Sequence, residues 1–157
     1  MRQCRFTLTV LTIIASMSAL AEVVGGAEGV QISVTLDAQA AEESAGKPIT
    51  GRLYVFTSRR EGREPRFGPD WFSPEPFFGL EVNDFAPGEA CTLDDAADGF
   101  PGPLSTLPQG TYRVQAMLDQ DFNTCHAALG VGNLYSDVVS WELDPSSPAP
   151  LELKLVH

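Results

Sequence analysis

Short runs in which apolar and polar residues alternate are the feature of this sequence that most restricts its fold. In the first run, 30–36, Val30, Ile32, Val34 and Leu36 occupy every second position, the pattern of a β-strand with one buried face. Six further runs are candidate strands: 51–58, 77–82, 90–93, 111–118, 138–143 and 151–156. No window places apolar residues at helical spacing over three turns. The sequence therefore predicts an all-β fold, an antiparallel immunoglobulin-like β-sandwich of about seven strands, with a small barrel as the alternative.

One turn supports the sandwich. Leu107, Pro108, Gln109 and Gly110 lead directly into Tyr112 and the long run that follows. In Greek-key sandwiches a tyrosine at this place ties its hydroxyl back to the preceding turn, forming a tyrosine corner. We therefore expect a structural role for Tyr112. The Cys, Trp, Cys order of immunoglobulin domains is absent from the sequence, so the predicted likeness concerns architecture only.

The N-terminus has the composition of a secretory signal peptide. Two arginines precede a mostly apolar stretch, and Ala19 and Ala21 supply the small residues that a signal peptidase requires. A retained membrane anchor is the alternative, but about 16 apolar residues would span only ~24 Å of a ~30 Å hydrocarbon core. We predict a signal peptide over 1–21, a Gly-rich flexible lead-in over 22–29 and one domain over 30–157. The expected protein is secreted or periplasmic and has no membrane span after cleavage.

Two cysteines, Cys91 and Cys125, remain after the predicted cleavage. In an oxidising compartment a pair is usually bridged, so the sequence predicts a disulfide between them. Two unpaired buried thiols are the alternative.

The charge is strongly acidic and unevenly placed. The chain has 10 Lys and Arg against 21 Asp and Glu, a net charge of −11. Such a chain is a poor ligand for nucleic acid, whose phosphates require clustered cations. Arg59, Arg60, Arg63 and Arg66 nevertheless lie close together in the sequence. They either orient an acidic partner or occupy a solvated hairpin tip.

A segment rich in aromatic residues and proline follows these arginines. Residues 64–78 hold five of the 14 aromatics and four of the 12 prolines. If exposed, the aromatics would form an apolar patch of the kind that marks a binding surface. The alternative is a long connection that closes one end of the sandwich with its aromatics buried. The predicted partner-binding residues are Phe67, Trp71, Phe72 and Phe77.

Asp119, Asp121 and Asn123 alternate like the first ligands of a calcium loop, which makes them a weak calcium candidate. Thr124 and Gly130 depart from the loop pattern, and a turn with side-chain-to-backbone bonds is the alternative. The sequence contains no nucleophile elbow, zinc-protease or nucleotide-binding motif. We therefore expect a protein that is not an enzyme, with no catalytic residue and no cofactor apart from the possible calcium.

Several runs together resemble one known module. They are the Gly51 to Ser58 strand, the Pro65 to Phe78 segment, Asp98 to Pro101, Leu107 to Ala116 and the Gly132 to Ser136 run. This combination resembles the immunoglobulin-like N-terminal module of secreted bacterial esterases of the α/β-hydrolase type. In that family the hydrolase domain follows the module, whereas this sequence ends at His157, so no catalytic residue carries over. The resemblance implies an accessory module that acts on a separately encoded exported hydrolase or a cell-surface component.

Two functions follow as expectations. The first is a non-enzymatic binding module for a protein or cell-surface partner, acting through the aromatic segment. The second is a carbohydrate-binding module in which Trp71 and its neighbours stack on sugar rings.

Overall fold

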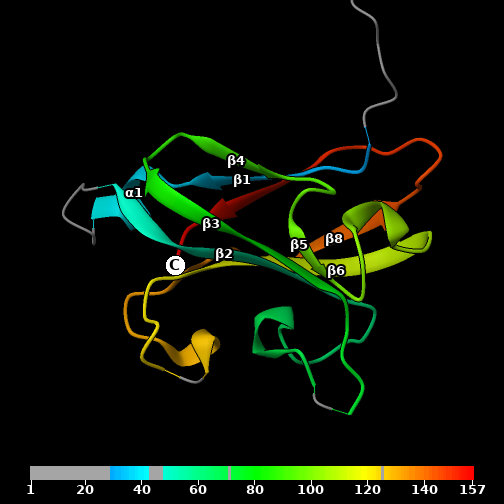
Figure 1. Cartoon of the computed structure of the whole chain (residues 1–157), viewed down its shortest axis with the longest axis horizontal. Coiled ribbons are helices and arrows are strands. Elements are labelled where there is room, and N and C mark those ends of the chain that lie inside the picture. The colour runs from blue at the N-terminus through cyan, green and yellow to red at the C-terminus, as the bar shows by residue number, and fades with distance from the viewer. Residues whose placement is uncertain (1–28, 43–47, 71, 125) are drawn as a thin grey trace, which may run out of the picture.

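The computed structural model describes residues 29–42, 48–70, 72–124 and 126–157, which form a β-sandwich of two packed sheets (Figure 1). A three-stranded sheet has the order β4 (Ala90–Leu93), β1 (Ile32–Leu36) and β9 (Leu151–Leu155). A six-stranded sheet has the order β5 (Asp98–Phe100), β3 (Phe77–Phe85), β2 (Ile49–Ser58) and β6 (Gly110–Asp119), with β7 (Leu134–Tyr135) and β8 (Val139–Leu143) both paired to the far edge of β6. The other elements are the short α-helix α1 (Ala38–Glu42) and the 3-10 turns η1 (Pro65–Phe67), η2 (Leu104–Thr106) and η3 (Ala127–Leu129).

The prediction of an all-β sandwich is confirmed, and all seven predicted strands occur. Two short strands, β5 and β7, were not predicted because three and two residues are too few to show alternation. One pair departs from the antiparallel prediction, since β1 and β9 run parallel with Ile32 opposite Leu151. Alternation tells which face of a strand is buried and does not tell which strand lies beside it.

The interior between the sheets is built from alternate residues, as the sequence pattern requires. Ile32, Val34 and Leu36 of β1 are almost fully buried, and Leu53 and Val55 of β2 face them from the other sheet. Alternate residues of β6 and β9 complete the core: Val114, Ala116, Leu118, Leu151, Leu153 and Leu155. Burial of this apolar surface is the main driving force that holds the sheets together.

The tyrosine corner predicted at Tyr112 is present. The Tyr112 hydroxyl donates to the carbonyl of Pro108 at 2.7 Å, and the side chain is buried against Trp141. Arg59 adds a contact that the sequence did not reveal, because its guanidinium donates to the same hydroxyl and lies 4.6 Å above the ring centre. The corner therefore joins the end of β2 to the start of β6.

Several predictions fall on residues that the structure does not describe. The signal peptide, most of the lead-in, Trp71 and Cys125 lie outside the described residues. Within the described part of the chain, no helix has the length and apolar character needed to cross a membrane.

Candidate functional site

The outer face of the six-stranded sheet, the side turned away from the three-stranded sheet, is covered in part by two long connections. The β2–β3 connection (residues 59–76) and the β6–β7 connection (residues 120–133) both extend below the sheet in Figure 1. Arg113 of β6 fastens the first of them, because its Nη1 donates to the carbonyls of Arg60 and Arg63 at 3.0 and 2.9 Å. The β2–β3 connection thus lies across the outside of the sheet rather than closing an end of the sandwich.

A buried glutamine holds the middle of the β2–β3 connection. The Gln115 side-chain carbonyl accepts from the backbone N–H of Arg66 at 3.2 Å, and its amide donates to Glu64 at 3.0 Å and to the carbonyl of Ser136 at 2.9 Å. Gln115 is 1 % exposed, so these bonds satisfy a polar group that would otherwise be costly to bury. The bonded carboxylate is stabilised in its charged form: Arg66 first, and then Gln115, lower the pKa of Glu64.

Arg66 joins the two connections. Its guanidinium bonds Glu64 at 2.7 Å and donates to the carbonyl of Ala128, in η3, at 3.1 Å. It also lies 3.9 Å from the ring centre of Tyr135 and 4.2 Å from that of Phe67. One arginine therefore fixes the two covering segments to each other and to β7.

The aromatic residues predicted to bind a partner are separated. Phe67 is partly buried beneath Arg66, whereas Phe72 is 99 % exposed on the β2–β3 connection. Phe77 belongs to β3 and is half-buried on the outer face. Trp71 is not among the described residues. One of these aromatic side chains is therefore partly covered and another is fully open to solvent, on a connection that lies over the sheet and not at an end of the sandwich.

A row of aromatic rings crosses the outer face of the sheet and was not foreseen as a unit. Phe100, Phe77 and Phe56 occupy matching positions on β5, β3 and β2, and successive ring centres are 5.7 and 6.1 Å apart. Tyr54 extends the row, 5.7 Å from Phe56, and Arg52 lies over its ring. The sequence did contain a signal for this row, because Tyr54 and Phe56 alternate with Leu53 and Val55. Apolar residues on both faces of a strand are typical of a sheet that is covered on both sides.

The arginines also gather on this side of the molecule. All six arginines among the described residues lie on the outer face or on the β2–β3 connection: Arg52, Arg59, Arg60, Arg63, Arg66 and Arg113. The single lysine in the described residues, Lys154, pairs with Asp37 on the other sheet. Six of the seven Lys and Arg side chains of the described residues therefore lie on this side, which extends the predicted Arg59 to Arg66 cluster. Four acidic residues of the β2–β3 connection balance its four arginines: Glu61, Glu64, Asp70 and Glu75.

The large exposed apolar side chains follow the same distribution. Among the described residues they are Phe72, Phe100, Phe122, Leu129 and Val131. Phe72 lies on the β2–β3 connection and Phe100 on the edge strand β5, and the other three lie on the β6–β7 connection, where Val131 is 91 % exposed. Aromatic residues and arginine are the side chains that protein interfaces favour.

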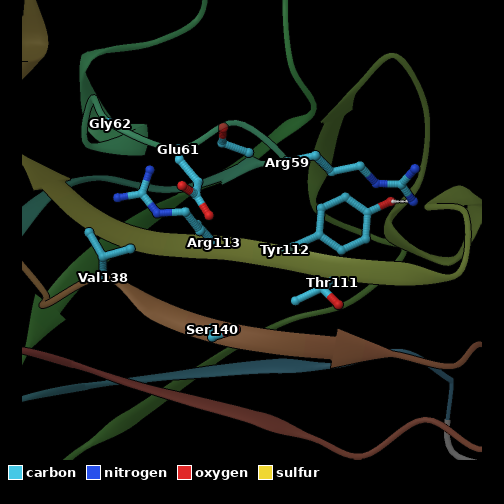
Figure 2. Close-up of a pocket in the computed structure, with 9 residues that line it drawn as sticks. Arg59, Glu61, Gly62, Thr111, Tyr112, Arg113, Val138 and Ser140 are labelled. Carbon is cyan, nitrogen blue, oxygen red and sulfur yellow. Dashed lines mark hydrogen bonds between the residues drawn. The ribbon is translucent and has the colours of Figure 1, made fainter.

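Two hollows open on this side of the sheet. The larger, about 650 Å³, lies between the start of the β2–β3 connection and strands β6 and β8 (Figure 2). Arg59 and Arg113 mark its two ends, and Thr111 and Ser140 lie between them. The smaller, about 300 Å³, is lined by Glu64, Gln115, Tyr135, Asp137 and His157, with the imidazole of His157 3.0 Å from Asp137 and stacked on Tyr135.

The calcium candidate forms a hydrogen-bonded turn. Asp119 accepts from the side-chain amide of Asn133 at 2.7 Å, and Asp121 accepts from the backbone N–H of Asn123 and from the hydroxyl of Thr124. The Thr124 hydroxyl is the main cause that lowers the pKa of Asp121. Within the described ranges, no group of three His, Cys, Asp or Glu is placed to hold a metal ion. These contacts are those of a hydrogen-bonded turn, which the sequence offered as the alternative to a calcium loop. A calcium site stays a prediction.

Of the two cysteines in the predicted disulfide, only Cys91 is among the described residues. Cys91 lies on β4, is half-buried and has no disulfide partner among the residues described, and burial raises the pKa of its thiol. Cys125 lies outside the described residues. The disulfide therefore stays a prediction.

Comparison of the chain with protein-family models, curated proteins and solved structures found no match.

Proposed function

We propose that this protein is a non-enzymatic binding module that docks a protein or cell-surface partner through the outer face of its six-stranded sheet. The observation that carries the proposal is that arginines and exposed apolar side chains gather on the same side of the molecule. All six described arginines and all five large exposed apolar side chains of the described residues lie on this face or on its two connections. Exposed apolar surface costs solubility and is typically retained where it binds.

The fixed geometry of the face supports binding further. Arg113 and Gln115 fasten the β2–β3 connection to β6, and Arg66 fastens it to the β6–β7 connection. A surface that is ordered before binding loses less conformational entropy when a partner docks. The exposed side chains of Phe72, Phe122 and Leu129 therefore project from anchored segments, as interface anchors do.

The immunoglobulin-like assignment, export to the periplasm or cell exterior and an exported hydrolase as partner are parts of the same proposal. They rest on the N-terminal sequence, on the resemblance to the esterase module and on the sandwich architecture. An acidic body whose cations gather on one side would orient such a partner before contact.

The test compares capture of exported proteins by the wild type and by variants of the face. We expect one partner, identified by mass spectrometry, to be lost from the double variant Phe122→Ser and Leu129→Ser and from Phe72→Ser. It should be retained by Thr92→Ser, which changes an exposed residue of β4 on the other sheet. Capture that is equal for all four proteins, or no reproducible partner at all, would contradict the proposal.

Carbohydrate binding is the second candidate function, and the row formed by Tyr54, Phe56, Phe77 and Phe100 favours it. Aromatic rings offer apolar faces on which sugar rings can stack. Binding on a glycan array that disappears in Phe100→Ala or Trp71→Ala, and persists in Phe122→Ser, would favour this function over protein docking.

A further inference from the structure

We propose that the larger hollow, between the start of the β2–β3 connection and strands β6 and β8, binds an acidic segment of the protein partner. The inference rests on the proposed docking function and adds the chemistry of one contact. Arg113 receives one carboxylate of the segment, Arg59 receives a second, and the segment lies along β6 between them. Figure 2 shows the two guanidinium groups well apart, together with Thr111 of β6 and Ser140 of β8, which also line the hollow.

Both arginines are held in place without a carboxylate partner among the described residues. Arg113 donates Nη1 to two backbone carbonyls of the β2–β3 connection, and Arg59 donates Nη2 to the carbonyls of Pro108 and Gln109 and to the Tyr112 hydroxyl. A backbone carbonyl orients a guanidinium without neutralising it. Each group keeps Nε and one further nitrogen that have no acceptor among the described residues.

Three of the other four arginines on this face differ in one respect, because Arg52, Arg60 and Arg66 each pair with a carboxylate of the chain itself. The fourth, Arg63, lies over the ring of Phe67 and does not line the hollow. No carboxylate of the described residues lies within ion-pair distance of Arg59 or Arg113. In a chain with 21 acidic residues, two oriented and unpaired arginines in one hollow are available for an external carboxylate.

The shape of the hollow favours a polypeptide over a small molecule. Its volume of about 650 Å³ lies in the usual range for ligand sites, but it is widely open to solvent. The hydroxyls of Thr111 and Ser140 form no hydrogen bond with other described residues and can bond to a peptide backbone. An extended peptide places alternate side chains on one face, so two acidic residues separated by one residue can reach both ends.

Glu61 limits the charge that the hollow accepts. Its exposed side chain lies beside Arg113 and forms no ion pair with the described residues (Figure 2). A densely charged polyanion would be repelled by this carboxylate, whereas a segment with two separated acidic side chains can avoid it. Removal of the charge in Glu61→Gln should therefore tighten binding of an acidic peptide about two- to fivefold at low salt.

The test uses two blocked tripeptides, acetyl-Glu-Gly-Glu-amide and acetyl-Gln-Gly-Gln-amide, titrated into the whole protein and followed by NMR. We expect the acidic peptide to shift the amide signals of 59–62, 111–113 and 138–140 saturably, together with the Nε–H signals of Arg59 and Arg113. The neutral peptide should leave these signals unchanged. Equal shifts with both peptides, or none with either, would overturn the proposal.

A matched pair of variants at one exposed position separates charge from fold. Ser140→Glu places a carboxylate in the hollow and should abolish binding of the acidic peptide, while Ser140→Gln, of the same size, should retain it. Ser140 lies opposite Arg113 across β8 and β6, so the new carboxylate can occupy that guanidinium. Neither variant replaces an arginine or a core residue, so both should remain folded, which thermal unfolding checks. Binding that survives in Ser140→Glu contradicts the proposal.

Further measurements distinguish a failure of this inference from a failure of the proposed docking function. If inorganic phosphate or glucuronate shifts the same signals at lower concentration than the acidic peptide, the hollow is an anion site for another ligand and the proposal is overturned. If the peptide fails to bind but partner capture depends on Phe122 and Leu129, the docking function stands without this contact. If the peptide binds but no partner is captured, the docking function fails while the hollow retains its chemistry.

Discussion

Asn133 is the residue on which the β6–β7 connection depends most. Its side-chain carbonyl accepts from the backbone N–H groups of Gln120 and Asp121, and its amide donates to Asp119 and to the carbonyl of Ala127. Because all these bonds are lost together, Asn133→Ala should lower the free energy of unfolding by about 2–4 kcal/mol. Urea denaturation measures this loss.

The control for that variant lies in the same connection. Asn123 is exposed and its side chain makes one long bond, 3.3 Å to Asp121. Asn123→Ala should change stability by less than about 0.5 kcal/mol. Equal losses for the two variants would show that Asn133 does not organise the connection.

The hydroxyl oxygen of Tyr112 stabilises the tyrosine corner. Tyr112→Phe removes the buried hydroxyl that joins Pro108 and Arg59, leaving both partners with one bond fewer, and should cost about 1–2 kcal/mol. Tyr135→Phe is the matched control, because the Tyr135 hydroxyl has no bond to the described residues. Thermal unfolding of both variants compares them, and a Tyr112→Phe protein as stable as Tyr135→Phe would contradict the tyrosine corner as a stabilising contact.

These residues differ in how far the sequence could predict them. The turn 107–110 before Tyr112 was sufficient to predict the corner, because donor and acceptor lie four residues apart. Arg59 and Asn133 could not be predicted, since their partners lie across different elements. The Gly132 to Ser136 run, noted only as part of a resemblance, proves structural: Gly132 has a positive φ of 82°, and the Ser136 hydroxyl accepts from the N–H of Ala116.

Strands β2 and β6 leave no room for a side chain at Gly51. A Cβ atom at this position would collide with the carbonyl oxygen of Asp119 and lie 3.3 Å from the Leu118 side chain. Gly51→Ala should therefore force the strands apart and cost about 1–3 kcal/mol, measured by urea denaturation. Gly29→Ala is the control, because nothing lies within 4 Å of a Cβ there. A Gly51→Ala protein of wild-type stability would show that the pair can separate freely.

The β2–β3 connection gives a prediction on pH. The pKa of Glu64 is lowered by Arg66 and then by Gln115, so its stabilising contribution is complete above the unfolded pKa of about 4.3 and is lost as the pH falls through the folded value. The stability difference between wild type and Glu64→Gln should therefore be largest near pH 7 and shrink toward pH 3. The side chain is 42 % exposed, so the effect should be small and weaken with salt.

Urea midpoints for both proteins at pH 7 and pH 3 test this sign. Glu89→Gln serves as a control, because Glu89 is exposed and forms no ion pair in the described structure. A difference between wild type and Glu64→Gln that grows toward pH 3 would contradict the assigned direction.

At the scale of elements, the sequence predicted those features that depend on residues close together in the chain. Strand positions followed from alternation, and β1 to β4, β6, β8 and β9 were all found in this way. The parallel pairing of β1 with β9 depends on the two ends of the domain meeting, which no single window contains. For the same reason the aromatic row remained hidden, since Phe56, Phe77 and Phe100 come from three different strands.

The whole molecule has two unlike sides, and only the Arg59 to Arg66 part of this asymmetry could be predicted from the sequence. Arg52 and Arg113 join that cluster on one face only after β2, β3 and β6 have paired. The acidic net charge, which excluded nucleic acid as a partner, does not show that six of the seven cations among the described residues lie on this side. A partner with acidic and apolar groups would therefore approach the outer face of the six-stranded sheet.

Leu118 and Leu129 are apolar residues with different roles, one in the core and one on the surface. Leu118 is fully buried between the sheets, and Leu129 is 66 % exposed on the β6–β7 connection. Leu118→Ala should lower the free energy of unfolding by about 2–5 kcal/mol, because it leaves a cavity in the core. Leu129→Ala should change it by less than about 0.5 kcal/mol while weakening partner capture. Urea denaturation combined with capture distinguishes the two roles, and a large stability loss in Leu129→Ala would mean that this side chain supports the fold rather than the interface.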